Sequence, residues 1–185
     1  MPTTAWPPSK WAADGVSSIN RLGELTVKAD YDDALSFDGN GLAPVALDGR
    51  WGFINAWGDL VIPAEFDEVW NFNDNGLAKI KLNGQYGFIN LRGELAIPAR
   101  FYEASDFAAN GLAAVMVEKG VKGGAWDERD AKWGYIDSQG KMVIKGKYIS
   151  ATGFGDDGLA VVCFWGPWDE DYRYINSQGK LFYIN

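Results

Sequence analysis

The sequence predicts an all-β protein built as a tandem array of about five units, each of roughly 35 residues and mainly three antiparallel strands. The first observation is a Gly-Leu-Ala triplet that recurs at intervals of 35, 35 and 47 residues. The second is an Ile-Asn or Ile-Asp pair that recurs at the same place in five units. Repetition at this period indicates repeat architecture before any other fold. The triplets begin at Gly41, Gly76, Gly111 and Gly158, and the pairs begin at Ile19, Ile54, Ile89, Ile136 and Ile175.

The first strand of each unit follows the triplet glycine and alternates in side-chain character. In residues 77–82, LAKIKL, apolar residues alternate with Lys79 and Lys81. That period of two predicts a strand with one buried face. The pair Asn83-Gly84 follows, and an Asp-Gly pair holds the same place one unit earlier. Such pairs tolerate positive φ at both positions, as a two-residue type I′ hairpin turn requires.

The second strand reads WGFIN at 51–55 and YGFIN at 86–90. A glycine inside a strand often marks the close approach of another backbone or of a large side chain. The next segment, NLRG at 90–93, fits a type I turn closed by a glycine bulge. The third strand is predicted to be short and apolar, and we expect Pro63 and Pro98 to end two of its copies.

The segments that connect the units carry apolar residues at a spacing of three, as in Phe66, Val69 and Phe72. We expect each connector to be an irregular or 3₁₀-like crossing anchored by these side chains. A full helix is disfavoured, because the segments are short and rich in β-branched and aromatic residues.

This pattern, Trp/Tyr-Gly-Phe/Tyr-Ile-Asn/Asp-x-x-Gly with its Gly-Leu-Ala partner, resembles the WG-repeat family, also called the KWG-repeat family. The matching segments are 51–55, 86–90 and 133–137, and the resemblance covers roughly residues 15–185. It implies an all-β repeat fold, and a binding or scaffolding role rather than one enzyme class. The last copy has Arg173 in place of the glycine, and the first copy departs further. Both look like the terminal capping copies that repeat arrays need.

The predicted organisation is a Pro- and Trp-rich segment at 1–13 followed by one repeat domain at 14–185. We expect the units to form an open curved stack. A five-bladed, propeller-like ring is the alternative. The first unit lacks a clear first strand and no leftover strand at the other end matches it, so the open stack is favoured. Residues 5–13 are a candidate for the missing strand.

Composition limits the function classes. The chain has 25 acidic and 17 basic residues and a net charge of −8, which argues against binding to nucleic acid or anionic lipid and suits a basic partner. It has no histidine, the commonest general base and metal ligand. The single cysteine, Cys163, excludes an intrachain disulfide and is expected to be a small apolar strand residue. We therefore expect no catalytic residues, no cofactor and no metal site.

The sequence also bears on location. No segment approaches the roughly 20 apolar residues of a membrane helix, and residues 1–15 hold no apolar run of signal-peptide length. We expect a soluble cytoplasmic protein.

Departures from the period locate the predicted binding surface. The distance from the triplet glycine to the second-strand aromatic is 10 residues in two units, then 22 and 14. The first hairpin loop is thus lengthened in consecutive units, and insertions on one face often mark the binding face of a repeat protein. Exposed tryptophans beside carboxylates offer an aromatic anchor with an acidic rim. The predicted partner-binding residues are Trp126, Asp127, Glu128, Asp130, Trp165, Trp168, Asp169, Glu170 and Asp171.

Two alternatives stay open for these loops and for the strands beside them. The loops can instead fold back so that their tryptophans cover the core. The first strands of the last two units are apolar on their outward faces, so either the loops or a partner must cover them. The outward residues are Ala114 and Met116 in one unit, and Val161, Cys163 and Trp165 in the next.

The function predicted from the sequence is a non-enzymatic module that binds another protein. One specific version is an immunity-type protein that neutralises a basic effector, since the chain is small, acidic and free of histidine. The alternative is a carbohydrate-binding module that uses the loop tryptophans.

Overall fold

A computed structural model of the chain describes residues 31–118, 121–122, 125–126, 130–166 and 170–183. These residues form four antiparallel four-stranded sheets and one separate two-stranded ribbon, and none of them is α-helical. The predicted all-β repeat fold is therefore confirmed. The first expected copy and the segment 1–13 lie outside the described residues.

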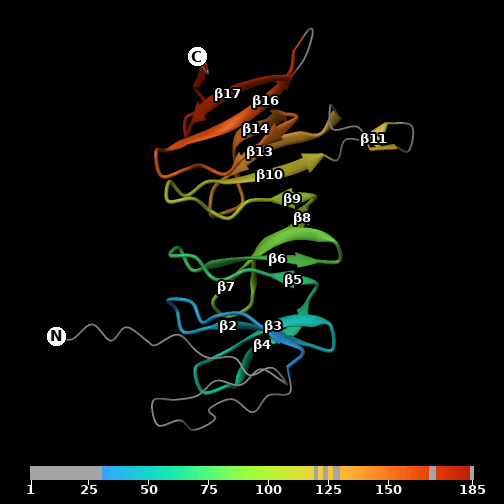
Figure 1. The fold of residues 1–185 in the computed structure, drawn as a ribbon, viewed down its shortest axis with the longest axis vertical. Helices are drawn as coiled ribbons and strands as arrows, with labels where there is room; N and C mark the ends of the chain where they lie inside the picture. Colours follow the sequence, from blue (N-terminus) through green and yellow to red (C-terminus); the bar gives the residue numbers. More distant parts are fainter. Residues whose placement is uncertain (1–30, 119–120, 123–124, 127–129, 167–169, 184–185) are drawn as a thin grey trace, which may run out of the picture.

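Each four-stranded sheet has the same strand order, and the two-stranded ribbon lies outside the third sheet (Figure 1). The first sheet holds β1 (Asp33–Ala34), β2 (Ala43–Leu47), β3 (Arg50–Ile54) and β4 (Leu60–Phe66). The second holds β5 (Glu68–Val69), β6 (Leu77–Leu82), β7 (Gln85–Asn90) and β8 (Leu95–Phe101). The third holds β9 (Glu103–Ala104), β10 (Ala113–Glu118), β13 (Lys132–Ile136) and β14 (Met142–Tyr148). The fourth holds β15 (Ser150–Ala151), β16 (Leu159–Trp165), β17 (Glu170–Asn176) and β18 (Leu181–Tyr183), while β11 (Val121–Lys122) and β12 (Ala125–Trp126) make the ribbon.

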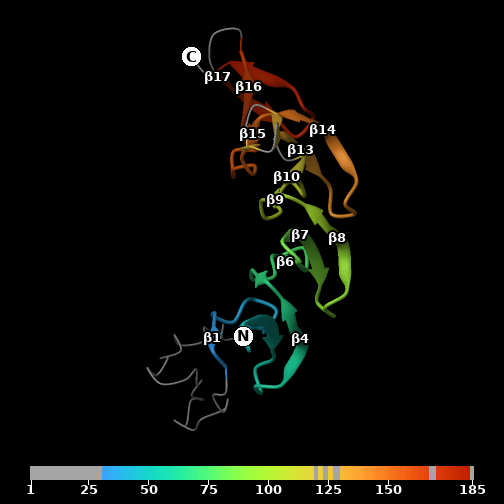
Figure 2. The ribbon, with the colours of Figure 1, turned by 90° about the vertical axis from the view of Figure 1, so that its right-hand side faces the viewer.

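The sheets stack face to face into an open, gently curved array (Figure 2). Strands β4, β8 and β14 follow one side of the curve, and the short strands β1, β9 and β15 follow the other. The first and fourth sheets lie at opposite ends, so the array is the predicted open stack and not the alternative ring. No helix among the described residues has the length and apolar character needed to cross a membrane.

The turns within the units are those the sequence predicts. Asn83 has φ of 52° and Gly84 of 77°, which are the positive values of a type I′ hairpin. In the following turn the Gly93 amide donates to the Asn90 carbonyl at 2.9 Å. A Cβ at Gly93 would also lie 2.9 Å from the Ile62 side chain of the previous sheet, so this turn glycine is needed for stacking as well as for its φ of 78°.

The glycine inside the second strand permits a bulge in the third. Tyr86 pairs with Phe101 and Phe88 pairs with Ile97, so three β8 residues stand opposite the single residue Gly87. A Cβ on Gly87 would lie 2.7 Å from the backbone of Ala99 within the bulge. The prediction that this glycine marks a close backbone approach is confirmed.

The expectation that Pro63 and Pro98 end their strands is wrong. Strands β4 and β8 continue through Pro63 and Pro98 and are seven residues long. Proline is tolerated there because each lies in an edge strand, in the bulged part that needs no ladder hydrogen bond. The connectors are irregular, which is one of the two forms expected, except that each contributes a two-residue strand such as β5 that pairs with the next long strand. The expected apolar anchors Val69 and Phe72 are buried.

The core lies between successive sheets and repeats with them. Phe53, Ile62 and Phe66 of the first sheet pack against Ala78, Ile80 and Ile89 of the second. An aromatic residue of the following connector closes each layer: ring centroids lie 5.0 Å apart for Phe53 and Phe72, 4.7 Å for Phe88 and Phe107, and 4.9 Å for Tyr135 and Phe154.

The expectation that the first strand buries only one face is also wrong. Lys79, on its predicted polar face, has a side chain only 10% exposed, because the third sheet covers that face. Its ammonium lies 4.2 Å from the centroid of the Trp70 ring and 3.2 Å from the Asp106 carboxylate. A sheet inside the stack has a neighbour on both sides, so alternation of side-chain polarity does not imply a solvent-facing surface.

Candidate functional site

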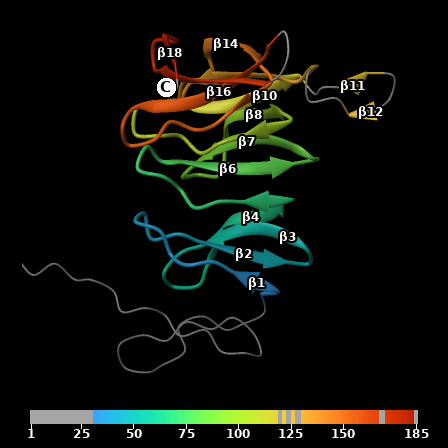
Figure 3. The same cartoon turned by 45° about the horizontal axis from the view of Figure 1, so that its top comes forward.

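The loops that join the first and second long strands of each unit all lie along one edge of the stack, here called the hairpin edge (Figure 1). The β2–β3 and β6–β7 loops are two-residue turns. The β10–β13 and β16–β17 loops are lengthened, and both leave from this same edge (Figures 1 and 3). The described ends of both insertions thus lie along the same edge of the stack.

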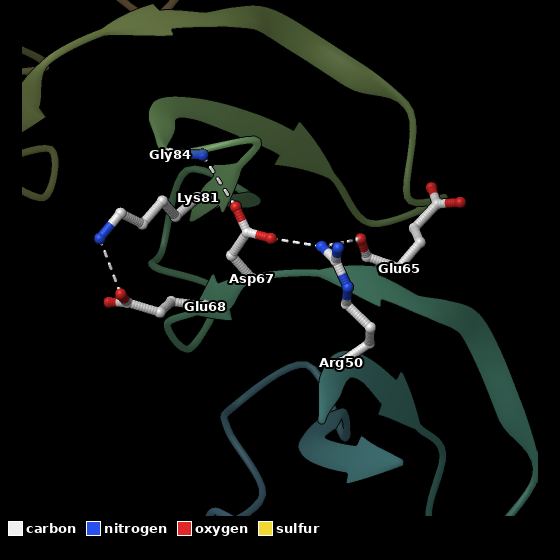
Figure 4. Close-up of polar contacts among 6 residues, drawn as sticks. All are labelled: Arg50, Glu65, Asp67, Glu68, Lys81 and Gly84. Carbon is white, nitrogen blue, oxygen red and sulfur yellow. Dashed lines mark hydrogen bonds and ion pairs between the residues drawn. The ribbon is translucent and has the colours of Figure 1, made fainter. Parts of the chain in front are cut away.

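A carboxylate from the preceding connector fixes each short loop (Figure 4). Asp67 accepts a hydrogen bond from the Gly84 amide at 2.9 Å and forms an ion pair with Arg50. Asp67 therefore ties the first sheet to the turn of the second. Asp32 accepts in the same way from the Gly49 amide at 3.2 Å.

The lengthened loops lack this carboxylate. The residue immediately before the two-residue strand is Tyr102 in the third unit and Ile149 in the fourth, where the first two units have aspartate. Sequence reasoning missed this difference, although aligning the connectors would have shown it. The two aspartates are present where the loop is a tight turn and absent where it is long.

A second ion pair flanks the short loop of the second unit. Lys81 donates to Glu68 at 2.8 Å, and this hydrogen bond raises the pKa of Lys81 (Figure 4). Lys132 and Glu118 form an ion pair at the base of the lengthened loop of the third unit. This pair closes the neck of the loop in place of the aspartate.

The insertion of the third unit forms a hairpin of its own. Val121 pairs with Trp126 and Lys122 with Ala125, and this ribbon projects from the hairpin edge, away from the stack (Figures 1 and 3). Asp130, at the end of the insertion, is exposed. Of the other predicted site residues here, Trp126 lies in β12, whereas Asp127 and Glu128 lie outside the described residues.

The insertion of the fourth unit begins at an exposed tryptophan. Trp165 is 51% exposed and lies directly opposite Glu170 across the β16–β17 pair. The Tyr172 hydroxyl donates a hydrogen bond to Glu170, which raises the pKa of Tyr172 to about 12. The predicted residues Trp168 and Asp169 lie outside the described residues.

Asp171 points to the other face of the sheet from Trp165 and Glu170. It pairs with Phe164 in register and accepts hydrogen bonds from Arg173, which lower its pKa. The structure therefore brings Trp165 and Glu170 together, and commits Asp171 to an ion pair on the opposite face.

No described residue packs over one face of the fourth sheet. The name terminal face is used here for five residues that the β-strand alternation and register place on this side: Val161, Trp165, Tyr172, Tyr174 and Phe182. They share the side with Leu159, Cys163 and Glu170. The four aromatic side chains are exposed by 51%, 49%, 36% and 39%, respectively. A terminal capping unit needs a polar outer face, so the expectation that the last copy caps the array is not met in this respect.

The apolar outward faces of the first strands differ between the third and fourth units. Ala114 and Met116 are buried, and Ala114 lies in the layer that the fourth sheet closes, so neither a loop nor a partner is needed there. On the terminal face Cys163 is buried beneath its neighbours, and burial raises the pKa of its thiol. Cys163 is thus the structural strand residue that the sequence predicts.

Acidic side chains do not gather into a metal site in the described part of the chain. No three of its Asp, Glu, Cys or His residues lie close enough together to hold a metal ion. The exposed features that remain are the hairpin edge and the terminal face.

These features define a β-repeat protein of stacked four-stranded units. The chain belongs to the family described as WG containing repeat, whose pattern matches residues 19–51, 51–86, 86–120 and 133–164. The resemblance seen in the sequence is therefore confirmed.

Two solved structures resemble the chain. One is described as the crystal structure of the eukaryotic initiation factor, with a TM-score of 0.58 and 11% identity over 96% of this chain and 50% of that one. The chain thus spans about half of that structure, and the likeness is one of fold. The other is a protein of unknown function from Bacteroides caccae, with a TM-score of 0.35 and 15% identity over 92% of this chain and 74% of that one. No curated protein matched the chain.

Proposed function

We propose that this protein is a non-enzymatic binding module whose hairpin edge engages another protein. One observation carries the proposal: the insertion of the third unit stands out from the stack as a separate ribbon, and the next insertion leaves from the same edge. A ribbon held away from the core offers its surface to a partner. Insertions on one face are the usual binding elements of repeat proteins.

The described residues of the fourth unit add an anchor beside this ribbon. Trp165 is half exposed at the edge, and Glu170 stands beside it. A large aromatic side chain next to a charged rim is the arrangement found at binding hot spots. Lys132 and Glu118 pin the neck of the ribbon to the third sheet, which limits the entropy lost when a partner binds.

The finer version of the proposal is that the partner is a basic effector that the protein neutralises. The net charge of −8 supports it, because opposite charge accelerates encounter between partners. If this version holds, raising salt from 50 to 500 mM should slow association markedly. An association rate that does not change with salt would remove the basic effector while leaving the protein-binding role intact.

The test is to excise the ribbon using a turn that the chain itself supplies. Residues 118–131 are replaced by Asn-Gly, the pair that joins β6 and β7 in the second unit. A photo-crosslinking residue at Asp130 of the full chain should give one dominant protein adduct in an extract of the source cells. The shortened chain should bind that identified protein at least tenfold more weakly while keeping its β-sheet circular dichroism.

A crosslinker at Asp74, an exposed residue of the β5–β6 connector, is the matched control and should not give that adduct. Equal adducts from the two positions, or unchanged affinity after excision, would contradict the proposal.

A carbohydrate-binding module is the second candidate, favoured by the exposure of Trp165 at the edge. A flat aromatic ring can stack on a sugar ring as readily as on a protein side chain. A glycan array probed with the full chain and with Trp165→Ala separates the two. Retention of one glycan class that Trp165→Ala abolishes, without any protein adduct at position 130, would favour the carbohydrate role.

A further inference from the structure

We propose that the terminal face is a self-association surface, on which a second copy of the chain packs the same face to form a closed dimer. The ribbon of the hairpin edge is not part of this surface, although Trp165 belongs both to the terminal face and to the hairpin edge. The proposal rests on what covers the equivalent face at each earlier level of the stack, on which end of the stack is open, and on the charge of the last unit.

The central position of the terminal face, Tyr174, is a core position in the earlier sheets. The residue that follows the second-strand glycine is Phe53, Phe88 or Tyr135, and each is at most 1% exposed. The equivalent residue after Arg173 is Tyr174, which is 36% exposed. The difference arises because each earlier sheet is followed by another, whereas no described residue packs over the fourth.

The internal layers of the stack show what kind of surface packs against the face equivalent to the terminal face. An aromatic ring from the next unit lies within 4.7 to 5.0 Å of each internal aromatic, and small or β-branched residues surround it. A partner for the terminal face must therefore be an apolar, aromatic sheet surface. The terminal face of a second copy has this character, with one aliphatic and four aromatic side chains and with Glu170 beside Trp165 at its rim.

The opposite end of the described stack does not offer such a surface. Ala43, Val45 and Ile54, which face away from the second sheet, are already buried. Head-to-tail addition of copies would thus find no free apolar face in the described first sheet. Tail-to-tail packing uses one patch on both copies, and this isologous arrangement closes at two molecules.

Charge favours a second copy over a basic partner at this end. Residues 145–185 contain five acidic and four basic residues, although the whole chain has a net charge of −8. The last unit is therefore close to neutral, and two copies can approach through it with little repulsion despite the acidic remainder. Tyrosine and tryptophan are also the residues most enriched at protein interfaces.

The test is the mass of the full chain in solution, measured by light scattering and sedimentation between 1 and 100 µM. The account expects a dimer with about twice the 20.3 kDa mass of the chain. Tyr174→Lys should raise the dissociation constant of this dimer by about 30-fold, an effect typical of a hot-spot residue. Phe182→Lys is the second variant, on a different strand of the same face, and should act in the same direction.

The control variants carry changes away from this face. Val61→Lys alters an exposed apolar residue on β4 and should leave the dimer intact. The chain with residues 118–131 replaced by Asn-Gly should also remain dimeric, which separates this proposal from the function proposed for the hairpin edge. A monomer at 100 µM, or a dimer that withstands both Tyr174→Lys and Phe182→Lys, would overturn the inference.

Discussion

The second and fourth sheets share a strand order and differ at one residue that sets the shape of the third long strand. The second has Gly87, and β8 bulges across it by three residues. The fourth has Arg173, and β18 pairs with β17 one residue at a time without a register shift. Where the glycine is lost the bulge is lost too, so the bulge depends on the missing Cβ.

A second difference between these sheets concerns burial. Phe88 of the second sheet is covered by Phe107 and the third sheet, whereas its equivalent Tyr174 in the fourth faces solvent. The same strand position is thus core inside the stack and surface at its end. In this stack the presence of a neighbouring sheet, and not the local sequence alone, decides whether the residue at this strand position is buried.

The largest expected effect comes from removing a ring inside the stack. Phe88→Ala should lower the free energy of unfolding by about 4 kcal/mol, because it leaves a cavity between two sheets. Tyr174→Ala should cost about 1 kcal/mol or less, since its ring is already partly in water. Urea unfolding of both variants, at protein concentrations low enough to keep the chain monomeric, measures the contrast. Equal losses would show that the two positions do not differ as described.

The next effect tests the bulge. Gly87→Ala should cost about 3 kcal/mol, since its Cβ would overlap the backbone of Ala99, which cannot move without breaking the β7–β8 pairing. Gly39→Ala is the matched control, because a Cβ there meets no atom within 4 Å and should cost less than about 1 kcal/mol. The account fails at this point if the two substitutions are tolerated alike in thermal unfolding.

A smaller effect is expected from the aspartate that fixes the short loops. Asp67→Ala removes the ion pair with Arg50 and leaves the Gly84 amide without its acceptor, which should cost about 1 kcal/mol. Asp74→Ala, at an exposed connector position, should change stability by less than about 0.5 kcal/mol. Faster amide exchange at Gly84 in the first variant alone would locate the loss in the turn.

The smallest effect is a loss of stability in alkali. Burial raises the pKa of Tyr135 above the ordinary value of 10.0, and burial also raises that of Tyr148. Between pH 10 and the raised pKa the unfolded chain loses phenol protons that the folded chain keeps, so stability falls as pH rises. The fall should be about 1 kcal/mol by pH 11 from Tyr135 alone, and Tyr148 acts in the same direction.

The control for the alkaline effect is Tyr135→Phe, which removes one of the two phenols. The variant should lose its hydrogen bond to the Thr152 carbonyl but show a shallower fall in stability between pH 9 and 11. An unchanged slope would assign the alkaline loss to other groups.

Local patterns in the sequence predicted most of what is local in the fold. The turn at Asn83-Gly84 and the glycine at position 87 are dictated by backbone sterics, so residue type alone identifies them. Pro63 was expected to end its strand, but proline is tolerated in a bulged edge strand. The bulge depends on a glycine that is distant in the sequence, so the residues around Pro63 do not indicate it. Lys79 was expected on a polar, solvent-facing side of its strand, but its burial depends on the sheet that follows in the stack.

The candidate sites were predictable to different degrees. Loop lengths placed both insertions on one edge, and Trp165 and Glu170 do lie together there. The orientation of Asp171 toward Arg173 depends on the strand register beyond the loop, which loop composition does not encode. The terminal face escaped prediction because Tyr174 occupies a position that is core in every other described unit.

The central claim is that the stack buries this face at every internal level and leaves it open at the fourth sheet. Acetylation of tyrosines by N-acetylimidazole, read by mass spectrometry on the dilute monomeric chain, tests it most directly. The account predicts rapid modification of Tyr172 and Tyr174 and protection of Tyr135 and Tyr148, which are buried between the third and fourth sheets. Protection of Tyr174 equal to that of Tyr135 in the monomer would contradict it.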